Sequence, residues 1–135
     1  MSHTAMRDES GMVGKIIVIW LLVLALLVVV ALDAGSIMIT KFRLSDVAAD
    51  AASDAANSWA KDHNTTAACA VAKATAQEED PKAQITQGGC KVDTSSGEVT
   101  LTLKKQAGTI LAGRLSFTRD LTRVTQKETN GPTTL

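Results

Sequence analysis

The stretch IIVIWLLVLALLVVVAL, residues 16–32, decides the fold, because all seventeen of its side chains are apolar. As a helix rising about 1.5 Å per residue it is roughly 25 Å long, which is close to the lower limit for crossing a bilayer. After Asp33 the residues up to Ile39 are again mostly apolar. We therefore expect a tilted transmembrane helix over residues 16–39, with Asp33 near its outer boundary.

A cleavable signal peptide is the main alternative to a retained membrane helix. Signal peptides carry an apolar region of about 7–15 residues that ends in small residues around an A-x-A cleavage site. Here the apolar run is longer, and Leu32-Asp33-Ala34 matches such a site poorly. A retained single-pass anchor in the cell membrane is therefore favoured.

The orientation of this helix is weakly encoded, because basic residues flank the apolar run almost equally on both sides. Arg7 and Lys15 precede it, and Lys41 and Arg43 follow it. The short N-terminal segment and the two cysteines beyond the run favour a cytoplasmic segment over residues 1–15. Residues 40–127 then form an extracytoplasmic domain.

Beyond Arg43, apolar side chains recur at spacings of three and four residues, which indicates one stripe along a helix. No proline interrupts residues 15–80, so we expect the membrane helix to continue directly into this amphipathic helix. Because the stripe is mainly alanine, another backbone can approach it closely. We assign helix packing to Val47, Ala48, Ala51, Ala52, Ala55 and Trp59.

An acidic edge runs along a different face of the same helix, with Asp46, Asp50 and Asp54 at i, i+4 and i+8. A calcium site is conceivable there, but one helix face cannot surround an ion with oxygen ligands. A solvated edge, or one that faces a basic neighbour, is the favoured interpretation.

A second, shorter helix is expected over residues 66–79. Asn64 or Thr65 is suited to cap its start, and the pair Asp80-Pro81 ends it because the residue before proline avoids helical geometry. Its inward residues are expected to be Ala67, Ala70, Val71 and Ala74.

The C-terminal part changes to the period of strands. Alternation of Val99, Leu101 and Leu103 with polar residues predicts one strand. An earlier strand is expected over residues 83–92, with a bulge or bend at Gly88-Gly89, and a turn at 93–97 joins the two. Leu115, Phe117 and Leu121 are expected to mark a last strand, and residues 128–135 a flexible tail. The fold class is thus α+β: a long transmembrane-plus-amphipathic helix, a short second helix and a three-stranded antiparallel sheet.

Two cysteines, Cys69 and Cys90, follow the apolar run and so share one compartment. A pair in a small exported domain usually forms a disulfide. It would join the second helix to the first strand, and closing a loop of about 20 residues adds about 3 kcal/mol. A metal site is disfavoured, because His63 has no second histidine near it.

Several functional classes find no support in the sequence. It contains no phosphate-binding glycine loop, nucleophile elbow or zinc-protease motif, so we expect no enzyme, cofactor, metal or small-molecule substrate. The basic residues after Pro81 are scattered without aromatic partners, which disfavours nucleic acid. A membrane-tethered binding module, or an accessory protein of a secretion complex, is an alternative function. The module would need an exposed apolar or aromatic patch. Trp59 and Phe117 are the candidates for it, and both are expected in the core.

The order of several short motifs resembles the TadE/TadG-like proteins, pilin-like components of the Flp (tight adherence) pilus and related secretion systems, in their short actinobacterial form. An E-x-G tripeptide precedes the apolar run, a D-[AG]-G follows it, and an alanine-rich helix comes next. A cysteine in a second helix and another before a G-x-V-x-V type strand also fit. The matching residues are Glu9-Ser10-Gly11, Leu32-Asp33-Ala34-Gly35, Asp46 to Ala52, Cys69, Cys90 and Gly97 to Leu101.

This resemblance implies a pseudopilin or minor pilin that packs its helix among other membrane proteins of a pilus or secretion system, including copies of itself. It also implies prepilin-type cleavage after Gly11, or after Gly14. Typical substrates carry glutamate five residues after the cut, whereas Ile16 stands there for a cut at Gly11. That departure favours a permanent membrane anchor.

Overall fold

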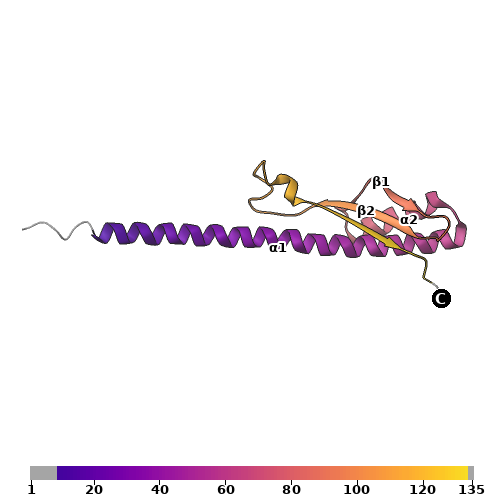
Figure 1. Cartoon of the computed structure of the whole chain (residues 1–135), viewed down its shortest axis with the longest axis horizontal. Helices are drawn as coiled ribbons and strands as arrows, with labels where there is room; N and C mark the ends of the chain where they lie inside the picture. Colours follow the sequence, from indigo (N-terminus) through magenta and orange to yellow (C-terminus); the bar gives the residue numbers. More distant parts are fainter. Residues whose placement is uncertain (1–8, 134–135) are drawn as a thin grey trace, which may run out of the picture.

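The computed structural model describes residues 9–133 as two helices and a three-stranded sheet (Figure 1). In chain order these are α1 (Glu9–Asp62), α2 (Thr65–Glu79), β1 (Gln84–Val92), β2 (Val99–Gln106), the 3₁₀ turn η1 (Arg119–Thr122) and β3 (Arg123–Asn130). The predicted α+β fold class is confirmed.

Helix α1 is a single unbroken rod of 54 residues, roughly 80 Å long at the rise of an α-helix. It begins at Glu9 and so reaches into the predicted cytoplasmic segment, of which residues 1–8 lie outside the described part. It ends at Asp62 because His63 takes a positive φ of 50° and its N–H returns to the carbonyl of Trp59 at 2.7 Å. The membrane-type and amphipathic segments therefore form one helix, as predicted.

Helix α2 turns back along the end of α1 (Figure 1). Asn64 caps it by accepting a hydrogen bond from the N–H of Ala67 at 3.0 Å. Its buried residues are Ala68, Ala72 and Ala76. The predicted inward set of Ala67, Ala70, Val71 and Ala74 is wrong, because a helix this rich in alanine gives little apolar contrast between its faces.

The sheet has the order β1-β2-β3 and is antiparallel throughout. The register of β1 against β2 shifts between Ile85 and Cys90, which confirms the bulge expected at the glycine pair. The last strand is β3, at residues 123–130, so the strand predicted around Leu115–Leu121 is wrong. The predicted flexible tail from residue 128 is also wrong at its start, because Thr129 pairs with Thr100 and Asn130 with Val99.

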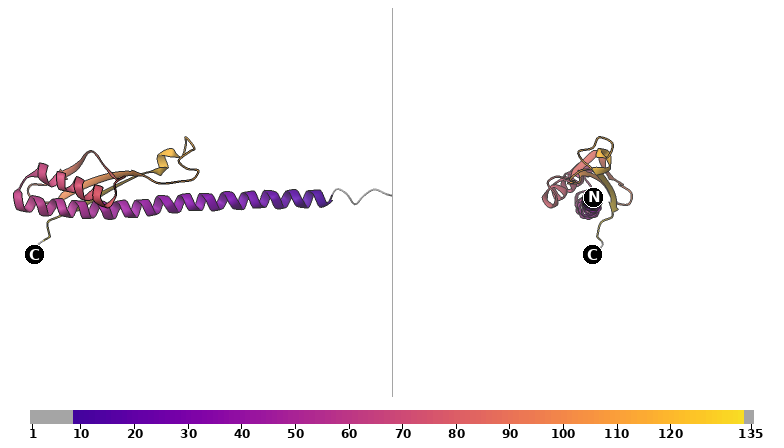
Figure 2. Two further views of the ribbon diagram at one scale, coloured as in Figure 1. Left: turned by 180° about the vertical axis from the view of Figure 1, so that it is seen from behind. Right: turned by 90° about the vertical axis from the view of Figure 1, so that its left-hand side faces the viewer.

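Both helices cover one face of the sheet (Figure 2). The core between them is made of small side chains with few large ones. Its largest fully buried apolar members are Leu44, Val99, Leu101 and Leu103. Apart from Leu44 and Val47, the buried core residues of α1 and α2 are all alanines. Such small side chains allow the helices to approach the strands closely.

Candidate membrane-anchoring site

The N-terminal half of α1 extends away from the sheet with no other element beside it (Figure 1). Every side chain of the apolar run from Ile16 to Leu32 is exposed except Val29, which is half-buried. Only 6% of the most apolar 18-residue window of α1 is buried in the protein. This is unlike the core helix of a soluble protein, whose apolar residues are covered by the rest of its chain.

By length and composition this segment is a candidate membrane span, and it is the single such helix within residues 9–133. A signal sequence near the N-terminus can pass the same test of length and composition. Trp20 lies near the start of the run and is exposed. Tryptophan is enriched where membrane helices meet the headgroup region.

Asp33, the residue that follows the apolar run, accepts hydrogen bonds from the loop between β2 and β3. Its carboxylate accepts hydrogen bonds from the backbone N–H groups of Ile110 at 2.6 Å, Leu111 at 2.9 Å and Ala112 at 2.8 Å. Asp33 is only 6% exposed as a result. A buried carboxylate is costly unless its charge is satisfied, and three N–H donors satisfy it here.

One turn further along α1, the Ser36 hydroxyl donates to the carbonyl of Gly108. Together Asp33 and Ser36 fix the loop between β2 and β3 on α1. Residues 33–39 were expected inside the membrane span. The loop covers one face of this stretch, and Ile37 packs against the core. On the side that faces the domain, the exposed apolar rod therefore ends at Leu32.

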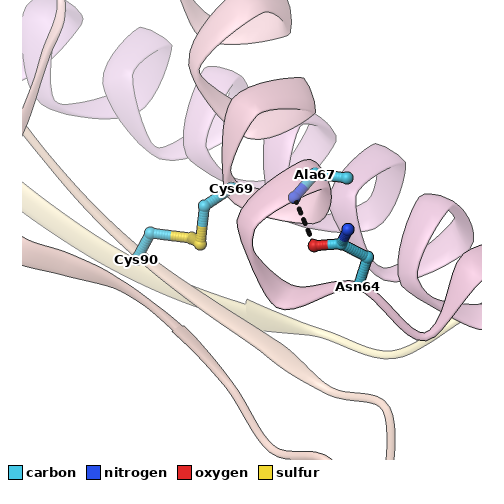
Figure 3. The surroundings of a disulfide bond; sticks show 4 residues. All are labelled: Asn64, Ala67, Cys69 and Cys90. Atoms are coloured by element: carbon cyan, nitrogen blue, oxygen red, sulfur yellow. Dashed lines mark hydrogen bonds between the residues drawn. A yellow bond between two sulfur atoms is a disulfide. The ribbon is translucent and has the colours of Figure 1, made fainter.

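The disulfide between Cys69 on α2 and Cys90 on β1 is present, with a Cα–Cα distance of 6.0 Å (Figure 3). It joins the two elements as predicted. Asn64, the cap of α2, lies five residues before Cys69 in the chain (Figure 3). The start of α2 is therefore held both by its cap and by the bond to the sheet.

The alanine stripe of α1 is inside the domain. Ala48, Ala51, Ala52 and Ala55 are fully buried and Val47 is 8% exposed, against α2 and the sheet. The stripe lies against one face of the sheet, so its alanines are not free to pack against a neighbouring protein. Any partner of α1 must use another face.

The two aromatic side chains singled out in the sequence behave differently. Trp59 packs partly buried against the core, as expected. Its indole Nε1–H is buried without a hydrogen-bond partner in the described residues. Phe117 is 79% exposed, so its predicted place in the core is wrong.

Gly11 and Gly14, the candidate cleavage positions, both lie in the first turns of α1. An added Cβ at either position would meet no atom within 4 Å. Both glycines are exposed, and neither lies against another element of the structure.

Charge is concentrated where α1 and α2 run side by side. Burial, together with repulsion from Asp50, Asp54 and Glu78, raises the pKa of Glu79. Next to it, burial opposes ionisation of Asp80, but hydrogen bonds from Lys105 and from the Lys82 N–H outweigh it and lower the pKa.

The predicted acidic edge of Asp46, Asp50 and Asp54 is exposed, and Asp54 accepts a hydrogen bond from Thr75 at 3.0 Å. Within residues 9–133 no group of three or more histidine, cysteine or acidic side chains is placed to hold a metal ion. Two open grooves follow α1, of about 460 and 400 Å³, and Arg43 and Lys105 line both. Neither encloses a volume in which a small substrate would be shielded from water.

Sequence reasoning missed the role of Asp33 as a loop acceptor, although it noted its position. The available signal was the charge itself, because an acidic residue inside an apolar helix must find donors. The donors lie 77 to 79 residues away, and nothing in the sequence marked them.

The fold and this site define a protein with one long helix, half of it an exposed apolar rod and half the spine of a small disulfide-linked α+β domain. Comparison with known proteins adds nothing further: no protein-family model, curated protein or solved structure matches the chain.

Proposed function

We propose that this protein is a membrane-anchored structural subunit of a pilus-type or related secretion machinery, acting as a pseudopilin or minor pilin. The observation that carries the proposal is the division of α1 into an exposed apolar half and a half that serves as the spine of the domain. Such a rod needs an apolar environment, which a bilayer or other apolar helices supply. A subunit that assembles by packing its helix against other helices would use both halves of α1 in this way.

In this proposal the apolar half of α1 spans the membrane with its N-terminus in the cytoplasm, and the domain lies outside. The disulfide supports that placement, because disulfides persist in oxidising compartments. We expect no prepilin-type cut in the segment before the span, since Ile16 stands where the resembling family has glutamate. N-terminal sequencing tests this: a start at Met1 or Ser2 is expected, and a start at Met12 or Lys15 would show processing.

The surface that meets neighbouring subunits must differ from the buried alanine stripe. Beyond Asp33, the apolar side chains of Met38, Ile39 and Phe42 are 59%, 58% and 65% exposed. They lie at i, i+1 and i+4, so they share one face of α1, away from the buried Leu44 and Val47. We infer that this face continues the apolar rod out of the membrane and packs against other helices.

Cysteine cross-linking in native membranes tests this packing. The variant Phe42→Cys places a thiol on the exposed apolar face, while the native cysteines are held in their disulfide. Asp50→Cys is the matched control, because it is also exposed on α1 but lies on the acidic edge. We expect a cross-linked product from position 42 and little from position 50. Equal or absent cross-linking at both would contradict packing through this face.

A further inference from the structure

The loop between β2 and β3 carries apolar side chains that the domain does not use. Ile110, Leu115, Phe117 and Leu121 are 53%, 42%, 79% and 68% exposed. A cluster of exposed apolar side chains in a small protein usually marks a contact surface. The loop and η1 form the part of the domain that reaches furthest toward the apolar half of α1 (Figure 1).

The hydrogen bonds to Asp33 fix the level of this loop along α1. Asp33 comes directly after the apolar run, and the N–H groups of Ile110, Leu111 and Ala112 lie within 2.9 Å of its carboxylate. The run of residues 16–32 is roughly 25 Å long, while the hydrocarbon core of a bilayer is about 30 Å thick. With Lys15 near the inner boundary, the outer hydrocarbon boundary therefore falls at or just beyond Asp33, where the loop begins.

The first half of the loop has its backbone N–H groups satisfied within the protein. Six consecutive N–H groups, those of residues 110–115, all have acceptors. Asp33 accepts three, the Thr109 hydroxyl accepts that of Gly113, and the Leu111 carbonyl accepts those of Arg114 and Leu115. Near lipid, backbone polar groups must find partners within the protein, and in water a surface loop has no such need.

Positive charge accompanies the apolar side chains. Arg114, Arg119 and Arg123 are exposed on the same segment. Asp120 is the one acidic residue among them, and it lies 3.9 Å from Arg123. The mixture of exposed apolar and cationic side chains suits an interface with anionic phosphate groups.

We propose that residues 108–121 form a second membrane contact, which inserts Phe117 and its apolar neighbours into the outer leaflet and binds anionic lipid headgroups through Arg114 and Arg119. This inference rests on the proposed membrane span. Bound in this way, the loop holds the domain close to the bilayer. A lipid surface fits the loop better than a second copy does, because the loop lies at the depth of the interface and carries the charge that complements phosphate.

Depth measurement on the full chain in lipid vesicles tests the proposal. An environment-sensitive fluorophore is attached to Phe117→Cys, to Val23→Cys within the span, or to Ser95→Cys in the exposed turn between β1 and β2. The native cysteines do not react, because they form the disulfide. Each labelled protein is exposed to a quencher carried on lipid acyl chains and to aqueous iodide.

We expect lipid quenching at positions 117 and 23 and iodide quenching at position 95. If position 23 is quenched by lipid but position 117 behaves as position 95 does, the loop contact is wrong and the span stands. If position 23 is not quenched by lipid, the proposed span fails and the loop contact fails with it. Shielding of position 117 from both quenchers, growing with the protein-to-lipid ratio, would mean that a second copy covers the loop, and would overturn the proposal.

The charge dependence is tested in the same assay with neutral phosphatidylcholine vesicles and with vesicles that also contain phosphatidylglycerol. Anionic lipid is expected to raise the ratio of inserted to free loop by about fivefold for each arginine. The double variant Arg114→Gln/Arg119→Gln should lose that gain, and Lys91→Gln, an exposed lysine on β1, should keep it. A gain that survives in the double variant would overturn the assignment to anionic headgroups.

Discussion

Replacing Asp33 by alanine removes the acceptor of three backbone N–H groups and releases the β2–β3 loop from α1. A hydrogen bond to a charged partner contributes about 1.5–3 kcal/mol. Three bonds to one carboxylate are not independent, and water can replace part of what is lost. We therefore expect the free energy of loop opening to fall by about 3 kcal/mol, which corresponds to roughly a hundredfold increase in the opening constant.

Hydrogen exchange on the full chain in lipid nanodiscs measures this directly. The amides of Ile110, Leu111 and Ala112 donate to Asp33, so their exchange should accelerate in Asp33→Ala. Asp33→Asn keeps one carbonyl oxygen as an acceptor and should give an intermediate rate. Asp50→Ala removes an exposed carboxylate from the same helix and should leave the three amides unchanged. Exchange in Asp33→Ala at the wild-type rate would refute the role of Asp33 as the loop acceptor.

Three further predictions concern the domain. Reducing the disulfide should lower the free energy of unfolding by about 3 kcal/mol, seen as a lower denaturant midpoint for the reduced chain. Gly97→Ala should cost about 1–3 kcal/mol, because Gly97 has φ +76° and an added Cβ would lie 2.9 Å from the Trp59 ring; Gly108→Ala, which meets no atom within 4 Å, should be near neutral by thermal melting. Because the pKa of Asp80 is lowered, its bond to Lys105 stabilises the fold fully above the ordinary carboxyl pKa of about 4, and this stabilisation is lost as the pH falls through the lowered pKa. Lys105→Met should remove about 1–2 kcal/mol at pH 7 and little at pH 2.5, measured by urea unfolding; an equal loss at both pH values would contradict the linkage.

The long helix, the central strand and the disulfide could be predicted because each is encoded over a short stretch. Seventeen apolar residues in succession and the absence of proline specify α1. The alternation of Val99, Leu101 and Leu103 specifies β2, and all three are fully buried. In these segments the local pattern and the final environment agree.

The last strand could not be predicted from apolar periodicity, because β3 is mostly polar and buries only Val124. Its attachment to α1 depends on polar bonds. Asn130 donates to the carbonyl of Ala49 at 2.7 Å, and Ser45 donates to Glu128 at 2.5 Å. The apolar residues Leu115, Phe117 and Leu121, which precede β3 in the chain, suggest a strand by their hydrophobicity. In the structure they are exposed.

In the membrane-anchoring site, too, features encoded in a short stretch could be predicted, and contacts between distant segments could not. The apolar half of α1 is evident in the sequence, whereas the loop at Asp33 depends on a contact between segments more than 70 residues apart. Charge in an apolar helix indicated that a partner must exist. It could not indicate which N–H groups supply it.

The measurement that tests the central claim most directly is the intact mass of the protein after alkaline carbonate extraction of the membranes in which it is made. If the apolar half of α1 is a retained anchor, the protein stays in the membrane pellet with residues 16–32 included in its mass. A soluble protein in the supernatant whose chain begins after Leu32 would contradict the anchor and identify the apolar run as a cleaved signal sequence.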